Sequence, residues 1–245
     1  MIKLIYCLRR LQHLSLEEFQ VHWLEHHSQF GLRLKALRRY VQYHTLANDP
    51  TQEAMAQAGV SSVEPFDGIM VAWWDSIEAL HTEMERNSDV AAALEDEKLF
   101  IDHRRSIACI AQEHVIVEPE GAVPYVYSAC LRRRSEIDRA DFQKAWLNPI
   151  HLELIHRAHA QGLVRGYMQN HTLLGDAGRV EGLGKADDPW DGISAAYFDS
   201  VAKYKALVAS RLVAQEAFED ERKYIDHSRS VHMLMRRHVI KNIVR

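Results

Sequence analysis

The chain has few cysteines, no long apolar run and no excess of positive charge. It holds three cysteines in 245 residues, too few for a disulfide framework, so we expect Cys7, Cys109 and Cys130 to be reduced core residues. No segment approaches the roughly 18 apolar residues of a membrane span. Arg9 and Arg10 interrupt the apolar start, which disfavours a signal peptide. With a formal net charge of −4, these absences predict a cytoplasmic protein that binds neither nucleic acid nor a membrane.

The sequence contains the same module twice. The phrase "YVQYHTL" at 40–46 recurs as "YMQNHTL" at 167–173. Other matched phrases are "CLRR" at 7–10 and 130–133, and "FIDHRRS" at 100–106 with "YIDHSRS" at 224–230. A repeat of this length is a tandem duplication. We therefore expect a first repeat at 1–118, a linker at 119–124 and a second repeat at 125–245.

Each repeat predicts the element order β, α, β, β, α, β. In the first repeat a short apolar strand starts at Ile2, and Ser15 with Glu18 forms a capping-box signature for the first helix. The order is that of the split βαβ, or ferredoxin-like, unit. One such unit leaves one face of its sheet bare. We expect an α+β protein in which two repeats pack sheet to sheet, so that one chain imitates a homodimer. A monomer would then be complete, and further dimerisation stays open.

Five motifs of the first repeat, each with a counterpart in the second, carry a family resemblance. They are "F..HW..HH" from Phe19, "YVQ.HTL" from Tyr40, "FDGI" with "WWDS" from Phe66, "DEKLFID" from Asp96 and "EHVIV" from Glu113. In this order they resemble the EthD family within the dimeric α/β-barrel superfamily, over nearly the whole chain. The resemblance implies a wide hydrophobic cavity and no obligatory organic cofactor. Val71 and Ala195 stand where many members of that family have an acidic residue.

Three polar side chains alternate along the second predicted strand, so they share one face of the sheet. They are Tyr40, Gln42 and His44, matched in the second repeat by Tyr167, Gln169 and His171. An imidazole that titrates near neutral pH suits a general base. The pattern predicts His44 and His171 as catalytic residues and the tyrosines and glutamines as substrate-binding residues. The alternative is a hydrogen-bonded network that orders the strand edge.

The third predicted strand of each repeat combines an acid with an aromatic ring. Asp67 shares a strand face with Trp73, and Asp191 shares one with Tyr197. We predict that the acids bind a substrate and that the rings form apolar walls. The competing interpretation, which the Asp-Gly pair favours, is turn chemistry at the start of a strand.

Further histidines are candidates for chemistry. His27 keeps the position of the resembling helix motif, and His114 and His238 are matched on the fourth strands, so we predict all three as catalytic. His232 has no counterpart, which predicts a specialised substrate pocket, against the alternative of a satisfied core histidine. His22 and His26 have a spacing that metal sites use, but no HExxH pattern accompanies them, so we predict no metal site.

The second repeat also has a glycine-rich loop, "GDAGRVEGLG", at 175–184. It lacks the strand and helix context of a phosphate-binding turn. We predict that it is a flexible flap over the cavity.

Together these features predict a cofactor-independent lyase or isomerase, above all a dehydratase, that acts on a hydrophobic small molecule, aromatic compounds included. Histidines would move the protons, and tyrosine and glutamine would hold the developing oxyanion. One alternative is a cofactor-free monooxygenase in the same cavity, and another is a non-catalytic binding protein for a hydrophobic metabolite. A haem or metal enzyme that uses His27, His114 or His232 is a further alternative.

Overall fold

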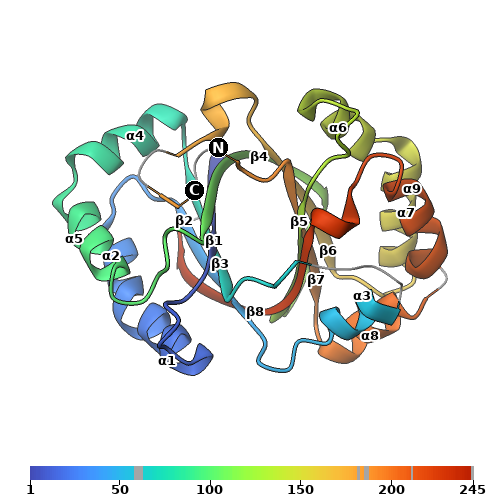
Figure 1. Ribbon diagram of the computed structural model, residues 1–245, viewed down its shortest axis with the longest axis horizontal. Coiled ribbons are helices and arrows are strands. Elements are labelled where there is room, and N and C mark those ends of the chain that lie inside the picture. Colours follow the sequence, from blue (N-terminus) through green and yellow to red (C-terminus); the bar gives the residue numbers. More distant parts are fainter. Residues whose placement is uncertain (58–62, 181–182, 185–187, 211, 244–245) are drawn as a thin grey trace.

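The computed structural model describes residues 1–57, 63–180, 183–184, 188–210 and 212–243, and its two repeats share one barrel (Figure 1). The first repeat contains β1 (Ile2–Leu8), α1 (Leu16–Val21), η1 (His22–His27), α2 (Ser28–Arg33), β2 (Arg39–Thr45), α3 (Thr51–Gln57), β3 (Gly68–Trp74), α4 (Ile77–Arg86), α5 (Ser88–Glu97) and β4 (Ile107–Val117). The second contains β5 (Tyr125–Leu131), α6 (Arg139–Trp146), α7 (Pro149–Ala160), β6 (Gly166–Thr172), η2 (Gly175–Gly178), β7 (Gly192–Phe198), α8 (Val201–Val208), η3 (Leu212–Ala217), α9 (Phe218–Glu221), η4 (His227–Arg229) and β8 (Val231–Asn242). Within these described ranges, no helix is both long enough and apolar enough to span a bilayer.

The eight strands form one closed barrel in the order β1-β3-β2-β8-β5-β7-β6-β4. Each repeat contributes four adjacent strands in the same relative order, as the ferredoxin-like pattern predicts. The two sheets are also joined edge to edge. β2 pairs with β8, where Gln42 lies opposite His238, and β4 pairs with β6, where His114 lies opposite Gln169. The joining is possible because β4 and β8, at 11 and 12 residues, are long enough to reach the other repeat.

Local sequence signals fix the helix ends. Ser15 and Glu18 form the predicted capping box at the start of α1. In the second repeat α6 ends at Trp146, and α7 begins at Pro149 with the Asn148 side chain as its cap. The helical run is interrupted between α6 and α7 because proline has no N–H group and is best accommodated in a first helical turn.

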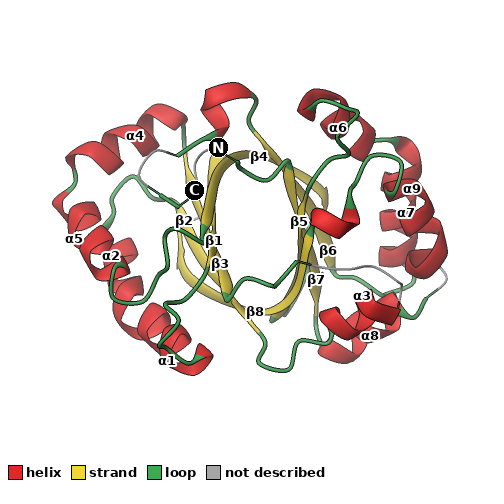
Figure 2. Ribbon diagram, viewed as in Figure 1, coloured by secondary structure: helices red, strands yellow, loops and turns green. Residues whose placement is uncertain are grey.

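The strands separate an inner apolar layer from two outer layers. Alternate residues such as Ile5, Val71 and Met233 point into the barrel, whereas Leu4, Ala72 and Leu234 point outward under the helices. Figure 2 shows the yellow barrel between two groups of red helices: α1, α2, α4 and α5 of the first repeat on one side, and on the other the α-helices of the second repeat together with α3. The face predicted to be bare in a single unit is thus buried inside the barrel.

Each repeat also reaches across to the other. α3, which lies between β2 and β3 in the chain, is beside α8 of the second repeat (Figure 1), and the Tyr204 hydroxyl donates to Thr51 Oγ1 at 3.3 Å. In return, Val180 and Leu183 from the predicted flap pack into the apolar layer of the first repeat. Residues 181–182 of that flap lie outside the described residues. A loop of each repeat therefore packs against the helical layer of the other.

Candidate functional site

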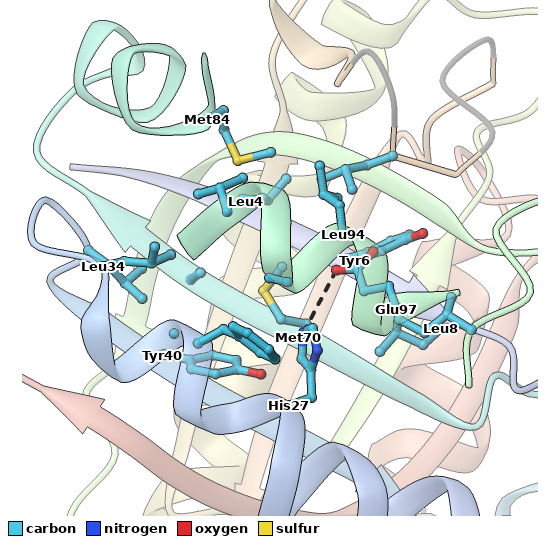
Figure 3. A pocket seen from close by; sticks show the side chains of 18 of the residues that line it. Leu4, Tyr6, Leu8, His27, Leu34, Tyr40, Met70, Met84, Leu94 and Glu97 are labelled. Atoms are coloured by element: carbon cyan, nitrogen blue, oxygen red, sulfur yellow. Dashed lines mark ion pairs between the residues drawn. The ribbon is translucent and has the colours of Figure 1, made fainter. Parts of the chain in front are cut away.

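A cavity of about 90 Å³ lies between the outer face of the first repeat's sheet and its helices (Figure 3). Its walls are mainly apolar and include Leu4, Leu34, Met70, Met84, Leu94 and Leu183. Its polar lining comes from Tyr6, His27, Tyr40 and Glu97. An apolar pocket with a few convergent polar groups is the usual form of a small-molecule site. Its volume is smaller than the wide cavity implied by the resemblance. Met70 and Met84 are flexible side chains, and their rearrangement can enlarge it.

His27 is held in one orientation by an acid. It lies in η1, a π-helical turn, and such turns occur often at functional sites. Its Nδ1 lies 2.8 Å from Asp96 Oδ2, so an N–H on Nδ1 donates to the carboxylate and Nε2 carries the free lone pair. Burial lowers the pKa of His27 from its usual value, which leaves the ring neutral at pH 7. The free nitrogen can therefore accept a proton.

Glu97 faces the free nitrogen of His27. Its Oε1 lies 3.8 Å from His27 Nε2, the contact marked by the dashed line in Figure 3. Burial, followed by the charge of Asp96, raises the pKa of Glu97 to about 8. The carboxyl is thus protonated at neutral pH, and its buried Oε2 has no hydrogen-bond partner among the described residues. A neutral acid beside a free imidazole nitrogen supplies a proton donor and a proton acceptor to one bound molecule.

Two tyrosines complete the polar lining. The Tyr6 hydroxyl lies 2.7 Å from His103 Nδ1, and the Tyr40 hydroxyl accepts a hydrogen bond from Gln42 Nε2 at 2.8 Å. Burial raises the pKa of both tyrosines above its usual value, so both stay protonated. Gln42 lies behind Tyr40 and orders it.

His44 and His171 lie away from the cavity. His44 Nε2 lies 2.9 Å from Gln42 Oε1, and the ring stacks on Trp23 at 4.6 Å between centroids. His171 repeats this arrangement with Gln169 and Trp146. Burial lowers the pKa of both histidines to about 3. Stacking on the tryptophans that cover the sheet places both histidines outside this pocket, and the catalytic roles predicted for them stay predictions.

The other matched histidines extend these arrangements. The His238 ring lies 4.5 Å from that of His44, and the His114 ring lies 4.3 Å from that of His171. Both are half-buried at the two seams of the barrel. The lining of the first repeat's cavity does not include them.

The two rings predicted as aromatic walls, those of Trp73 and Tyr197, lie on the inner face of the barrel, opposite to the face that lines the cavity. Tyr40 pairs with Ala72, whereas Trp73 pairs with Arg39 and points into the barrel. Tyr197 also points inward, where its hydroxyl lies 3.0 Å from that of Tyr43. Residues paired across strands share a face, so the register separates these rings from the pocket by the thickness of the sheet.

Asp67 and Asp191 order strand ends. Asp67 accepts from the Arg10 backbone N–H at 2.8 Å and from the Arg10 guanidinium. Asp191 accepts from the Arg133 backbone N–H and from Arg139 Nε, both at 2.9 Å. These contacts match the turn interpretation, and neither acid lines the cavity.

The counterpart of the cavity in the second repeat is filled by aromatic rings. Tyr127 and Tyr204 replace Leu4 and Leu80, and their rings lie 5.5 Å apart. His232, which replaces Ala108, is buried beside them with Nδ1 2.8 Å from the Tyr127 hydroxyl. It is thus a packed histidine in the second repeat, although its Nε2 has no hydrogen-bond partner among the described residues.

The second repeat also lacks a free imidazole nitrogen at the position of His27. His151 is the counterpart, and its Nε2 and Nδ1 each lie 3.3 Å from a tyrosine hydroxyl, those of Tyr167 and Tyr224. In the first repeat, Phe100 stands at the position that Tyr224 has in the second. Its ring has no hydroxyl group that could hydrogen-bond to an imidazole nitrogen. The first repeat therefore combines a cavity with an available base, whereas both nitrogens of His151 lie beside tyrosine hydroxyls.

The histidines considered as haem or metal ligands do not converge. His27 lines the first repeat's cavity, His114 lies at the β4–β6 seam, and His232 is packed in the second repeat. His22 Nε2 lies 3.1 Å from Asp96 Oδ1, so this nitrogen is hydrogen-bonded to a carboxylate and is not placed to bind a metal ion together with His26. In the part of the chain that the structure describes, no group of three or more His, Cys, Asp or Glu side chains could hold a metal ion.

Fold and site together define a tandem ferredoxin-like barrel with a small-molecule pocket under the helices of one repeat. The chain belongs to the EthD family, because the EthD domain profile matches residues 11–104 and 134–228. A search of curated proteins found no match.

Solved structures of low sequence identity share the fold. An anthrone oxidase-like protein is 11% identical, with 99% of this chain and 94% of that chain covered and a TM-score of 0.62. A candidate monooxygenase from Lactobacillus acidophilus NCFM is 10% identical, with 99% and 96% covered and a TM-score of 0.56. A mutant chlorite dismutase from Candidatus Nitrospira defluvii is 11% identical, with 98% and 92% covered and a TM-score of 0.50. At these identities the similarity shows the fold alone.

The names of these proteins correct the expected reaction. They are a candidate monooxygenase, an oxidase-like protein and a dismutase, and none of them is named as a lyase or an isomerase. The lyase expectation is therefore wrong, and the monooxygenase alternative fits the comparisons better. Sequence motifs for the fold could not separate the two, because this fold carries many chemistries.

Proposed function

We propose that the protein is an oxygen-using enzyme, a monooxygenase or oxidase, that acts on an apolar small molecule in the first repeat's cavity. The observation that carries the proposal is the facing pair of His27 and Glu97 in a mainly apolar pocket. The names of the fold neighbours support an oxidation, and the name of one of them suggests anthrone-like compounds as substrates. The substrate class is accordingly a planar ketone or phenol with an acidic C–H or O–H group.

The first step is a proton transfer. His27 Nε2 takes a proton from the methylene carbon that is conjugated with the carbonyl group through the aromatic rings, which in anthrone is the carbon opposite the carbonyl in the central ring, while Asp96 stabilises the imidazolium that forms. The protonated Glu97 carboxyl donates a hydrogen bond to the carbonyl oxygen as it becomes an enolate. Tyr6 and Tyr40 add neutral hydroxyls to the same wall.

The second step transfers electrons from the substrate to oxygen. The enolate gives one electron to O₂, and the two radicals combine to form a carbon–oxygen bond and a peroxide. The imidazolium returns its proton to the peroxide, and loss of water then converts the methylene carbon to a ketone. One methylene compound and one O₂ thus yield one ketone and one water, and the substrate itself is the reductant. The apolar walls exclude water, which would otherwise stabilise the anion and slow this step.

Oxygen consumption with anthrone as the probe tests the proposal. We expect purified protein to consume one O₂ per anthrone and to form anthraquinone and water, without added nicotinamide or flavin. An oxygen electrode and the absorption of the quinone measure the two amounts. The control is the spontaneous oxidation of anthrone in buffer at the same pH. A rate equal to that control, for anthrone and for hydroxylated anthrones alike, would overturn the proposed reaction.

A further inference from the structure

A second group of charged residues lies inside one end of the barrel, on the opposite face of the sheet from the cavity. Each of these residues stands two positions along its strand from an apolar residue that points into the barrel. The pairs are Lys3 with Ile5, Arg39 with Val41, Glu113 with Ala111, and Arg237 with Met235. By strand alternation all four therefore continue the inward rows. Lys3 and Arg39 both lie opposite Trp73, and Lys3 Nζ donates to Asn170 Oδ1 at 2.7 Å. We call Lys3, Arg39 and Arg237 the cationic mouth.

Aromatic rings fix the directions of these cations. Lys3 Nζ and the Arg39 guanidinium carbon each lie 4.7 Å from the centroid of the Trp73 ring. The Arg237 guanidinium carbon lies 5.9 Å from that of the Tyr197 ring. The charges of both arginines act on Tyr43, where they oppose the burial that raises its pKa. The two guanidinium groups thus approach the same space from neighbouring strands.

Positive charge in the cationic mouth exceeds negative charge. Lys3 pairs with Glu113, but neither arginine has an acidic partner within 4.0 Å in the described part of the chain. Arg39 Nε and Arg237 Nε are both buried, and neither has a hydrogen-bond partner among the described residues. Buried donors of this kind normally find an acceptor. Both side chains are half-buried, so solutes can reach their outer edges.

The fold does not require this charge. The positions in the second repeat that match Lys3 and Arg39 hold Val126 and Gly166, and Arg237 matches Glu113. The same barrel geometry is thus built at the matched positions without a lysine or a second arginine. A cluster whose lysine and first arginine have no charged counterpart across the duplication is more easily explained by a ligand than by the fold.

We propose that the cationic mouth binds a small oxyanion, a phosphate or a carboxylate, between Arg39 and Arg237, with Lys3 as a third donor. A planar guanidinium presents paired N–H groups that match two oxygens of such an anion. The anion would supply the acceptors that the two arginines lack. This site is separate from the oxidation site and does not depend on the proposed reaction.

Titration calorimetry with inorganic phosphate at constant ionic strength tests the inference. We expect saturable binding to the intact protein at pH 7, weakened about tenfold or more in Arg39→Met and in Arg237→Met, since a hydrogen bond to a charged group accounts for at least that factor. Arg236→Met is the matched control. Arg236 lies on the opposite face of β8, over the Tyr125 ring at 5.1 Å, and its loss should change the affinity less than twofold.

Competition with acetate then identifies the anion class. If acetate displaces bound phosphate, the site accepts carboxylates. If phosphate binds and acetate does not displace it, the site is specific for phosphate. If Arg39→Met does not fold, Arg39→Lys replaces it in the test. This variant keeps the positive charge but lacks the paired N–H groups of a guanidinium, so it should also weaken binding. The inference is overturned if wild-type protein shows no saturable binding of either anion, or if Arg236→Met weakens binding as much as the two inward variants.

Discussion

Replacing His27 by alanine is expected to lower oxygen consumption by about 100-fold or more. His27 Nε2 is the free nitrogen of the cavity, and the contribution of a positioned general base is about 10²- to 10⁴-fold. The measurement is the initial rate of oxygen uptake with anthrone at saturating concentration. Because the ring must be neutral to act, the wild-type rate should also fall as the pH drops below the lowered pKa of His27.

Two histidines provide controls for that variant. His26 is exposed beside His27, so His26→Ala should keep the wild-type rate within about twofold. His44 is stacked on Trp23 outside the pocket, so the rate of His44→Asn should fall far less than that of His27→Ala, provided that circular dichroism shows a folded protein. If the His44 variant loses the activity and the His27 variant keeps it, the base has been assigned to the wrong side chain.

Replacing Glu97 by glutamine is expected to remove the alkaline limb of the rate profile. The raised pKa, about 8, means that Glu97 loses its proton as the pH rises through 8, and the charged form can no longer donate a hydrogen bond to an enolate. Glutamine keeps an N–H donor at every pH. Oxygen uptake between pH 6 and 9 should therefore decline in the wild type and stay level in Glu97→Gln.

The same substitution should change how stability depends on pH. The carboxyl has a pKa of about 8 when folded and 4.5 in its reference state, so between these values the folded protein holds a proton that the unfolded chain has released. Its contribution is therefore fully present below pH 4.5 and is lost as the pH rises toward 8. Between pH 5 and pH 8, urea unfolding should show a loss of stability in the wild type that is smaller by a few kcal/mol in Glu97→Gln. Burial also raises the pKa of Glu221 to about 8, so both proteins should share the loss that comes from that residue. Equal losses in both proteins would show that Glu97 is ionised in the fold.

Much of the fold followed from the repeat and its strand order. The capping box at Ser15, the break at Pro149 and the order of strands within each repeat are local properties, so a sequence shows them directly. The edge joining of the sheets and the exchange of loops are not local. α3 lies in a stretch that had no clear helical period, and its position depends on contacts with the other repeat, such as that between Thr51 and Tyr204.

The site was harder to predict because it depends on register. Alternation placed Tyr40, Gln42 and His44 on one face, but only strand pairing shows that Trp73 belongs to the other face. Glu97 was missed because it lies within the charged stretch "EDEK", where a solvated helix face is the ordinary expectation. Its recurrence as Glu221, next to a recurring aspartate, is the signal that could have identified it.

Divergence of the two repeats supports the proposal that the site lies in the first of them. Both retain the acid pair, the histidine and the strand tyrosine of the first repeat's site. The second repeat adds the packed rings of Tyr127, Tyr204 and His232, and its Tyr224 hydroxyl lies 3.3 Å from His151 Nδ1. The retained tyrosine, Tyr167, lies 3.3 Å from His151 Nε2. Filling a cavity generally stabilises a protein, because an empty apolar space loses packing contacts. One half of the barrel can then be the rigid partner of the half that binds.

Binding of anthraquinone, the expected product, to two matched variants is the most direct test that the first repeat holds the site. Ala93 lines the cavity, and Ala217 is its counterpart among the aromatic rings of the second repeat. Ala93→Phe should fill the cavity and weaken binding, measured by quenching of tryptophan fluorescence, by tenfold or more, whereas Ala217→Phe should leave it within about twofold. The reverse result, with Ala93→Phe binding normally and Ala217→Phe losing the ligand, would place the site in the second repeat and contradict the assignment to the pocket of His27 and Glu97.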